Sequence, residues 1–413
     1  MKFRTTRKRQ AAIERKALRL LSDPLFLFKA SQTIGELGII GEEKNRLILF
    51  LAGISRTLRE PISILVKGST SSGKSTLVKK SILLFSPDCV IERAGLSGKA
   101  LAYGKGSLAA MILFILEYRC GRDSQLLLRL LQTEGEIKHE STSIRGSRRR
   151  TQTVKRFGKP VVLTTTTDDT VFEDDETRFL SVHANERPEQ TLAILEAQAA
   201  GDRAVKMHDL EVWRTATSLL TAQDRDFRNP PNWLRYVAQQ LPLNHIRVRR
   251  DWNKVLTFCK AISLCRRFES DPTRALNIDF RDYCVAYRIL EPVLSATMGG
   301  VYEQEVDLGN TVAALNRKLG RAVTIREVAD ELGWKNSLVY KHIKSAARHK
   351  VIDYEPGKRE KNVKRFLATE NRGQRFLPSP ASVMVHCPEV GKELTYNDPL
   401  SGEWRTLRRQ PVN

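Results

Sequence analysis

The run Gly68-Ser-Thr-Ser-Ser-Gly73-Lys74-Ser75 constrains the fold of this chain more than any other segment. It fits the pattern G-x-x-x-x-G-K-[ST] at every fixed position, with a β-rich run before it at 62–66 and a helical stretch after it at 74–84. Such a loop needs a strand on one side and a helix N-terminus on the other, because successive backbone N–H groups must curl around an anion. The segment therefore predicts a strand–loop–helix unit.

Short apolar runs alternate with helical stretches beyond this loop, which indicates an α/β fold with a parallel sheet. After the strand at 62–66 we expect three more strands, at residues 89–91, 109–116 and 161–166. A short helix (124–132) and a long basic polar stretch separate the last two. From Pro188 to about Thr297 the pattern is helical throughout.

The chain is strongly basic. Its 413 residues include 69 Lys and Arg against 47 Asp and Glu, a formal net charge of +22. Such an excess indicates a polyanionic partner, most often nucleic acid, although a merely soluble basic surface is the alternative. The six cysteines show no C-x-x-C spacing, so we expect neither a zinc site nor a disulfide framework.

The sequence gives no sign of a membrane segment. Its longest apolar run, 111–116, is far too short to cross a bilayer, and no secretory apolar core follows the basic start. We therefore expect a cytoplasmic protein of a bacterium, associated with the nucleoid and not with a membrane.

The loop and one acid predict hydrolysis of ATP with Mg²⁺. Lys74 should reach the β- and γ-phosphates, and the Ser75 hydroxyl should complete the Mg²⁺ shell. Glu117 ends the apolar strand 109–116, where it would polarise the attacking water and help to hold the magnesium. Because Leu116 precedes it where most such ATPases have Asp, Glu117 serves both roles or another acid assists. The alternative is an acid that merely ends a strand. The residues expected around the phosphates are Gly68, Ser69, Thr70, Ser71, Ser72, Gly73, Lys74, Ser75 and Thr76.

The order of these motifs resembles the AAA+ ATPases of phage and mobile-element replication proteins, which are related to the minichromosome-maintenance helicases. The resemblance covers roughly residues 35–300. Apart from the loop and the acid-ended strand, it rests on residues 94–101, 126–137, 163–166 and 176–180. In that family the segment matching 126–137 is a helix that leads into a β-hairpin inserted before the fourth strand. The resemblance implies a P-loop AAA+ core with this pre-sensor hairpin, followed by a helical lid.

The resemblance also implies further roles. Thr164 to Thr166 match the first sensor, which responds to the γ-phosphate through water; the alternative is merely a β-branched strand end. Any of the three could serve, and we assign Thr165 to the nucleotide. Arg178 matches the arginine finger, which reaches the nucleotide bound by the next subunit. Its alternative is a salt bridge to an acid of residues 173–176. Arg250 matches the second-sensor arginine at the start of a lid helix, with Arg249 as an adjacent competitor.

The basic stretch 133–159 is a candidate for nucleic-acid contact. Placed in the inserted hairpin of the family, its cations would line the central channel of a ring and contact phosphates there. Beyond Phe157 we see no aromatic platform, which suggests that the DNA backbone is followed and bases are not read. The alternative is a solvated loop. The cations assigned to DNA are Lys138, Arg145, Arg148, Arg149, Arg150 and Lys155.

Residues 308–370 indicate a separate small unit. Thr324-Ile-Arg-Glu327 is a capping box, and Gly333 ends the helix that follows. Asn336 or Ser337 caps a second helix, and strands at 351–354 and 363–367 would form a wing. The unit resembles the winged helix-turn-helix fold, whose second helix lies in a major groove; the alternative is a wing used for protein contacts. The outer residues of this helix assigned to DNA are Tyr340, Lys341 and Lys344.

These patterns divide the chain into five expected parts: a basic segment (1–34), the ATPase core (35–187), a helical lid (188–300), a winged helix (308–370) and a tail (371–413). The basic segment is a solvated leader or a nucleic-acid arm, and the tail is ordered or frayed.

We expect a homo-oligomer, a hexameric ring, acting as a DNA helicase or translocase in the replication of a phage, plasmid or integrated mobile element. Its channel would hold single-stranded DNA, and the winged helix would bind duplex. The alternative is an ATP-gated switch or loader that binds DNA without unwinding it. Because we recognise no primase domain in the sequence, a primase would be a separate partner.

Overall fold

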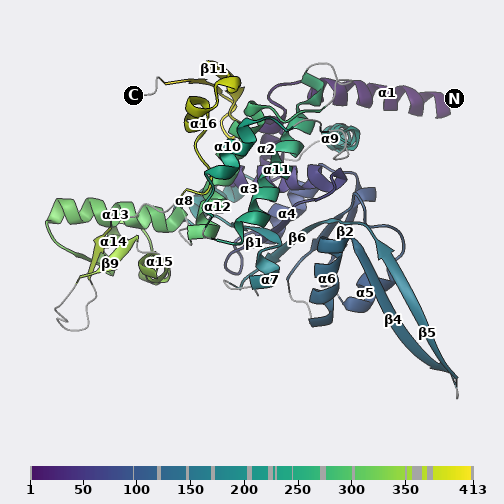
Figure 1. Cartoon of the computed structure of the whole chain (residues 1–413), viewed down its shortest axis with the longest axis horizontal. Helices are drawn as coiled ribbons and strands as arrows, with labels where there is room; N and C mark the ends of the chain where they lie inside the picture. The colour runs from purple at the N-terminus through teal and green to yellow at the C-terminus, as the bar shows by residue number, and fades with distance from the viewer. Residues whose placement is uncertain are drawn as a thin grey trace.

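A five-stranded parallel sheet lies at the centre of the computed structural model (Figure 1). Its strands, in order across the sheet, are β2 (Val90–Arg93), β3 (Ile112–Ile115), β6 (Val161–Thr166), β1 (Ser63–Lys67) and β7 (Phe179–His183). Every neighbouring pair is parallel, so all five carboxyl ends meet at one edge. The predicted α/β fold with a parallel sheet is confirmed. The residues that the structure describes are 2–95, 97–118, 122–145, 148–168, 173–201, 207–221, 227, 230–243, 245–269, 276–299, 303–348, 351–355, 365–369 and 375–410.

The four predicted strands are all present, and a fifth was missed. Strand β3 starts later than predicted, at Ile112, because Ala110 has a φ of 58° and breaks the extended run. The missed strand is β7, which lies at the sheet edge beside β1. It has only five residues and includes Ser181, so its apolar pattern is too short to identify a strand without the neighbour it pairs with.

Helices cover both faces of the sheet. On one face, α3 (Glu43–Ile54) and α4 (Lys74–Ile82) pack on alternate strand residues such as Ile64, Val66 and Phe114. On the other face, α5 (Gly98–Tyr103) and α6 (Arg122–Glu134) pack on the residues between them, such as Leu65 and Leu113. Both faces of the central strands are therefore buried, as is usual for a parallel sheet.

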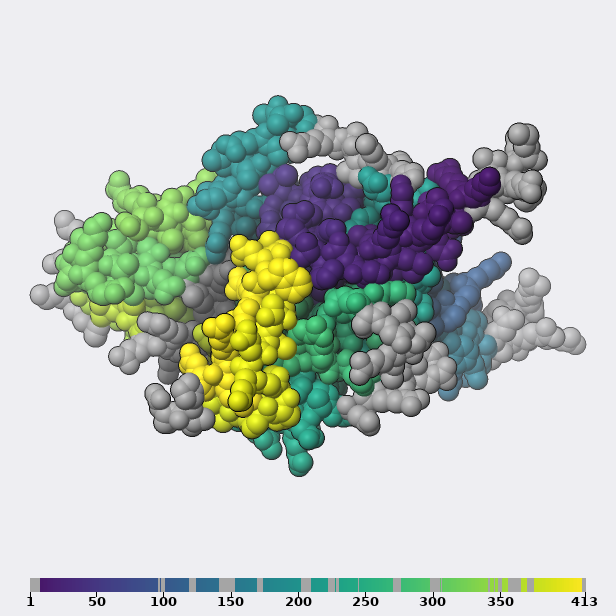
Figure 2. Space-filling view, turned by 90° about the horizontal axis from the view of Figure 1, so that it is seen from above, coloured from purple at the N-terminus to yellow at the C-terminus, as the bar shows by residue number. Residues whose placement is uncertain are grey.

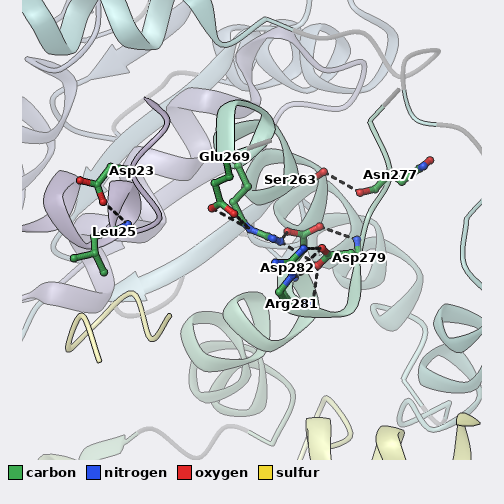
Figure 3. Close-up of polar contacts among 9 residues, drawn as sticks. Asp23, Leu25, Ser263, Glu269, Asn277, Asp279, Arg281 and Asp282 are labelled. Atoms are coloured by element: carbon green, nitrogen blue, oxygen red, sulfur yellow. Dashed lines mark hydrogen bonds and ion pairs between the residues drawn. The ribbon is translucent and has the colours of Figure 1, made fainter. Parts of the chain in front are cut away.

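Helices also fill the segment that follows β7, as predicted. They are α8 (Pro188–Ala199), α9 (Met207–Leu219), α10 (Trp233–Gln239), α11 (Val248–Cys265) and α12 (Phe280–Gly299). Ion pairs join the end of α11 to the start of α12, where Arg266 binds Glu269, Asp279 and Asp282 (Figure 3). Burial, together with the charge of the neighbouring Asp279 and against the opposing effect of Arg266, raises the pKa of Asp282 to about 7.

Both ends of the chain pack on this body. Helix α1 (Lys2–Leu21) lies against α9 and buries Ile13, Ala17 and Leu21, while α2 (Phe26–Glu36) belongs to the main core. Near the C-terminus, α16 (Pro380–His386) precedes a hairpin of β11 (Glu393–Asn397) and β12 (Trp404–Arg408). Its turn touches α2, since a Cβ at Gly402 would lie 2.8 Å from the Phe28 ring. Figure 2 shows these C-terminal residues in yellow beside the purple N-terminal helices.

Two units extend from the body. The hairpin of β4 (Glu136–Arg145) and β5 (Arg148–Phe157) is inserted between α6 and β6 and projects away from the sheet (Figure 1). The second unit contains α13 (Glu303–Leu319), α14 (Ile325–Leu332) and α15 (Asn336–Arg348). Its three-stranded antiparallel sheet has the order β8 (Val323–Thr324), β10 (Arg365–Ala368), β9 (Ile352–Tyr354).

Short elements complete the described chain. They are α7 (Glu173–Glu176) and the 3-10 turns Ser55–Thr57, Pro87–Cys89, Arg267–Glu269 and Pro388–Val390. Within the described ranges, no helix is both long and apolar enough to cross a membrane.

Candidate active site

The phosphate loop lies where β1 ends, between the carboxyl ends of β6 and β7. Two of its residues have positive φ angles, Ser71 at 68° and Gly73 at 80°. Gly73 occupies the N-cap position of α4 in the left-handed conformation, which costs glycine little. The loop therefore turns sharply onto the helix N-terminus, where backbone N–H groups and the helix dipole attract anions.

The loop fits a phosphate ligand because its first glycine leaves no room for a side chain. A Cβ at Gly68 would lie 2.7 Å from Ser72 Oγ and 3.0 Å from Glu186 Oε1. Lys74 begins α4 and is mostly buried, and its Nζ donates to the Gly68 carbonyl at 2.9 Å and the Ser69 carbonyl at 2.5 Å. Its ammonium group is thus held over the loop. Burial lowers the pKa of Lys74, against the effect of the Glu186 and Glu117 carboxylates.

Glu117 stands two residues after β3, at the same edge of the sheet. The residues on both sides of it are fixed by the sheet: Leu116 N–H donates to the Arg93 carbonyl at 2.9 Å, and Tyr118 N–H donates to the Thr165 carbonyl at 2.8 Å. Its carboxylate interacts electrostatically with Lys74. Lys74 and Glu117, which the sequence assigned to catalysis, therefore lie near each other within one chain.

The sensor threonines have different surroundings. Thr165 Oγ1 donates to the Leu116 carbonyl, directly beside Glu117, at 2.5 Å. Thr166 Oγ1 accepts from the Asp168 N–H, and Thr164 Oγ1 is buried with no hydrogen-bond partner. Thr165 is therefore the member of the trio whose hydroxyl is tied to the strand end that carries Glu117.

The residues present fit Mg²⁺ and nucleotide together. Ser75 lies in the first turn of α4, next to Lys74, and its side chain is partly exposed. A serine hydroxyl and carboxylate-bound water are ligands that Mg²⁺ accepts. Ser75 and Glu117 would hold the metal, and Thr76, also exposed, lies one residue further along the helix.

Glu186 was not among the residues selected from the sequence. It follows β7, and its Oε1 accepts a hydrogen bond from the Ser69 N–H of the loop. The two residues are 117 positions apart in the chain. Because β7 was not recognised as a strand, no pattern in the sequence placed its end beside the phosphate loop.

Two of the selected arginines lie at the opposite edge of the sheet. Arg178 and Arg250 line a pocket of about 370 Å³ formed by the residues just before β1, β6 and β7, together with α6 and α11. Arg178 Nη1 donates to the Asp174 carbonyl, and Arg250 Nη1 donates to Thr177 Oγ1. Burial lowers the pKa of Arg178, and the neighbouring Arg250 and Arg129 lower it further. Cations gathered in this way attract an anion.

The acids before Arg178 have other partners. Asp175 pairs with Arg129, and Glu176 pairs with Lys67. Asp174 and Asp175 still act on Arg178 through their charges, which raise its pKa against the effect of burial.

Arg250 lies with Arg178 and away from the phosphate loop of its own chain. Helix α11 begins against the start of β7, where Lys254 Nζ donates to the carbonyls of Thr177 and Phe179. Five residues of β1 separate this edge from the phosphate loop, about 15 Å at 3.3 Å per residue. The assignment of Arg250 to the nucleotide stays a prediction. Its competitor Arg249 is exposed on the same helix.

The basic stretch forms a hairpin, as predicted. Its ten-residue strands pair in the register Lys138 opposite Lys155 and Arg145 opposite Arg148, the latter pair nearest the turn. Lys138 and Lys155 are exposed, and Lys138 pairs with Glu136 at 3.4 Å. The backbone of residues 145 and 148–150 is described, and their side chains lie outside the described part.

The capping box and helix stop predicted for the C-terminal unit are also present. Thr324 caps α14 together with Glu327, and Gly333 ends the helix in the left-handed conformation with a φ of 64°. On α15, Tyr340 is exposed, and Lys344 Nζ lies 4.4 Å from its ring centroid. The side chain of Lys341 and residues 356–364 lie outside the described part.

A comparison with protein families agrees with the phosphate loop. Residues 27–219 match a family model described as the MTBMA_p00010 P-loop domain. No match was found among curated proteins. Among solved structures, the chain is similar to the Aeropyrum pernix Orc1 protein in complex with DNA, with 11% identity over 85% of this chain and 94% of that chain and a TM-score of 0.25. It is also similar to SCCmec type IV Cch, an active helicase, with 12% identity, coverage of 83% and 70%, and a TM-score of 0.33. The family match and the geometry of the loop together show that the chain contains a P-loop domain, a domain that binds nucleotides through their phosphates.

Proposed function

We propose that the chain is an ATP-hydrolysing DNA helicase or translocase that works as a ring of identical subunits, hexameric as in the family it resembles. One observation carries the proposal: the phosphate loop and the Arg178–Arg250 pocket lie at opposite edges of one sheet. A nucleotide on the loop of one subunit can meet these arginines only if another subunit supplies them. A contact that joins two different surfaces repeats head to tail, and such a contact can close into a ring.

In the proposed reaction each residue has one task. The backbone of the loop and Lys74 bind the phosphates, and Ser75 and Glu117 hold the Mg²⁺, which draws charge from the phosphate oxygens. Glu117 orients the attacking water and accepts its proton, and the Thr165 hydroxyl keeps the strand end beside Glu117 in place. Arg178 and Arg250 of the neighbouring subunit stabilise the charge that develops on the transferred phosphoryl group.

The two extended units would act on DNA. The hairpin carries cations along two ten-residue strands and leaves the body of the subunit, a shape suited to following a phosphate backbone in a ring channel. In the C-terminal unit, the arrangement of α14, α15 and the paired strands supports a winged helix with Tyr340 and Lys344 towards duplex DNA. The setting would be the replication of a phage, plasmid or integrated mobile element, with any primase as a separate partner.

The second candidate is an ATP-gated switch or loader that assembles on DNA without unwinding it. It needs the same site and the same basic surfaces, and the projecting hairpin favours the helicase. Strand displacement on forked DNA separates the two: we expect release of the displaced strand with ATP. DNA-stimulated ATP turnover without release of the strand would refute the helicase and support the switch or loader.

The nucleotide site itself is tested by Lys74→Ala. This change removes the ammonium group held over the loop, so we expect ATP binding or turnover to be lost. Lys79→Ala is the matched control, because Lys79 lies on the same helix and is paired with Glu92 on the surface at 2.9 Å. ATP hydrolysis close to the wild-type rate in Lys74→Ala would refute the site.

A further inference from the structure

A carboxylate that the proposed reaction does not use lies against the phosphate loop. Glu186 Oε1 accepts the backbone N–H of Ser69, and the same oxygen would be 3.0 Å from a Cβ placed on Gly68. Glu186 therefore lies directly over the first turn of the loop. Although burial, which lowers the pKa of Lys74, has the largest effect, the charge of Glu186 raises this pKa more than the charge of Glu117 does.

The backbone that carries Glu186 is fixed on both sides. Ala184 N–H donates to the Lys67 carbonyl at 2.9 Å, which extends the pairing of β7 with β1. Asn185 N–H donates to Glu42 Oε1 at 2.6 Å, and Arg187 forms an ion pair with Asp307 of α13. Pro188 then begins α8. The backbone on both sides of Glu186 is thus held in place, and its carboxylate lies beside the phosphate loop.

A carboxylate in this place acts against phosphate. Backbone N–H groups of the loop and the dipole of α4 attract anions, and Glu186 is an anion already within that field. A nucleotide brings several negative charges to the same few ångströms, and like charges this close repel each other even at the protein surface. The phosphates must therefore displace Glu186 from Ser69 or bind beside its charge.

We propose that Glu186 sets the nucleotide affinity of the phosphate loop by competing with the phosphate groups for the anion-attracting field of the loop. The inference rests on the proposed function, because it deepens the role of the same site. Glu186 is a positioning and affinity-setting residue and takes no part in bond making. Its charge weakens ATP binding, and its hydrogen bond holds Ser69 in place until the phosphates arrive.

The experiment separates the charge of Glu186 from its hydrogen bond. Glu186→Gln keeps an oxygen that can accept the Ser69 N–H and removes the charge, so ATP should bind about tenfold more tightly. Glu186→Ala removes both, and should also bind ATP more tightly than the wild type. Glu189→Gln is the control, since Glu189 is an exposed acid in the first turn of α8 and does not shift the pKa of Lys74 as Glu186 does. Its affinity should equal that of the wild type.

The measurement is isothermal titration calorimetry of the full chain with ATP and Mg²⁺, repeated with ADP. Unchanged or weaker ATP binding in both Glu186 variants would overturn the inference. So would equal tightening in Glu189→Gln, because the effect would then come from net charge alone. Failure of the proposed function would look different: the wild type itself would not bind ATP, and Lys74→Ala would change nothing.

Discussion

The cationic hairpin gives the sharpest test of DNA contact, because neutralising it changes a slope that is easily measured. We consider the triple change of Arg148, Arg149 and Arg150 to Gln, which removes three adjacent charges from the start of β5. Arg148 lies opposite Arg145 next to the turn, so the change removes most of the positive charge at the far end of the hairpin. At about 3.4 Å per residue, ten residues place this end about 30 Å from the base of the hairpin.

The magnitude follows from counterion release. Each phosphate contact on a single strand contributes about 0.7 to the slope of log affinity against log salt, so three lost contacts lower the slope by about 2. Between about 50 mM and about 200 mM salt, the wild type should then lose about 20-fold more affinity than the variant does. The assay is fluorescence anisotropy of a labelled single strand, titrated at several salt concentrations.

The matched control removes the same charge elsewhere. Arg15, Lys16 and Arg19 are exposed on α1, and changing them to Gln keeps the net charge of the two variants equal. We expect the control to keep the wild-type slope. A hairpin variant with the wild-type slope would place the hairpin outside the DNA path. Equal flattening in the control would show that the hairpin has no special part in the dependence on salt, and that either net charge or the basic segment 1–34 contributes as much.

Three further predictions concern the shared site and the stability of the chain. Arg178→Ala should lower the ATP turnover number about 10³-fold or more. Mixing this variant with inactive Glu117→Gln should restore part of the activity, because some interfaces then combine an intact Arg178 with an intact Glu117. No recovery would contradict a role in trans. Arg266→Met leaves the buried Asp282 carboxylate without its cation and should cost about 3–5 kcal/mol in urea unfolding, so a loss below about 1 kcal/mol would be inconsistent with the network. The hydrogen bond from Arg321 lowers the pKa of Glu327 from 4.5 to about 2, with help from the α14 cap. The ionised Glu327 carboxylate therefore stabilises the fold above pH 4.5, and this contribution is lost as the pH falls from 4.5 to about 2. Solvent screening limits the contribution of Glu327 to about 1 kcal/mol or less. Hydrogen exchange of α14 amides should show this loss in the wild type and a flat response in Glu327→Gln; identical profiles would refute it.

The sequence determined the features that depend on neighbours along the chain. The phosphate loop, the helix that begins at Lys74 and the capping box from Thr324 to Glu327 each form within a few residues, so a short pattern specifies them. Glu117 could be selected because an apolar strand ends just before it, and strand ends in a parallel sheet share an edge.

Only the tertiary structure decided which groups share an edge of the sheet. It added β7, and with it the contact between Glu186 and Ser69, whose partners are far apart in the sequence. It also placed Arg250 beside Arg178, at the edge of the sheet opposite the phosphate loop of the same chain. Contacts of this kind depend on strand order and helix packing over the whole domain. A local pattern can show that an arginine begins a helix, but the edge it faces is fixed by what that helix packs against.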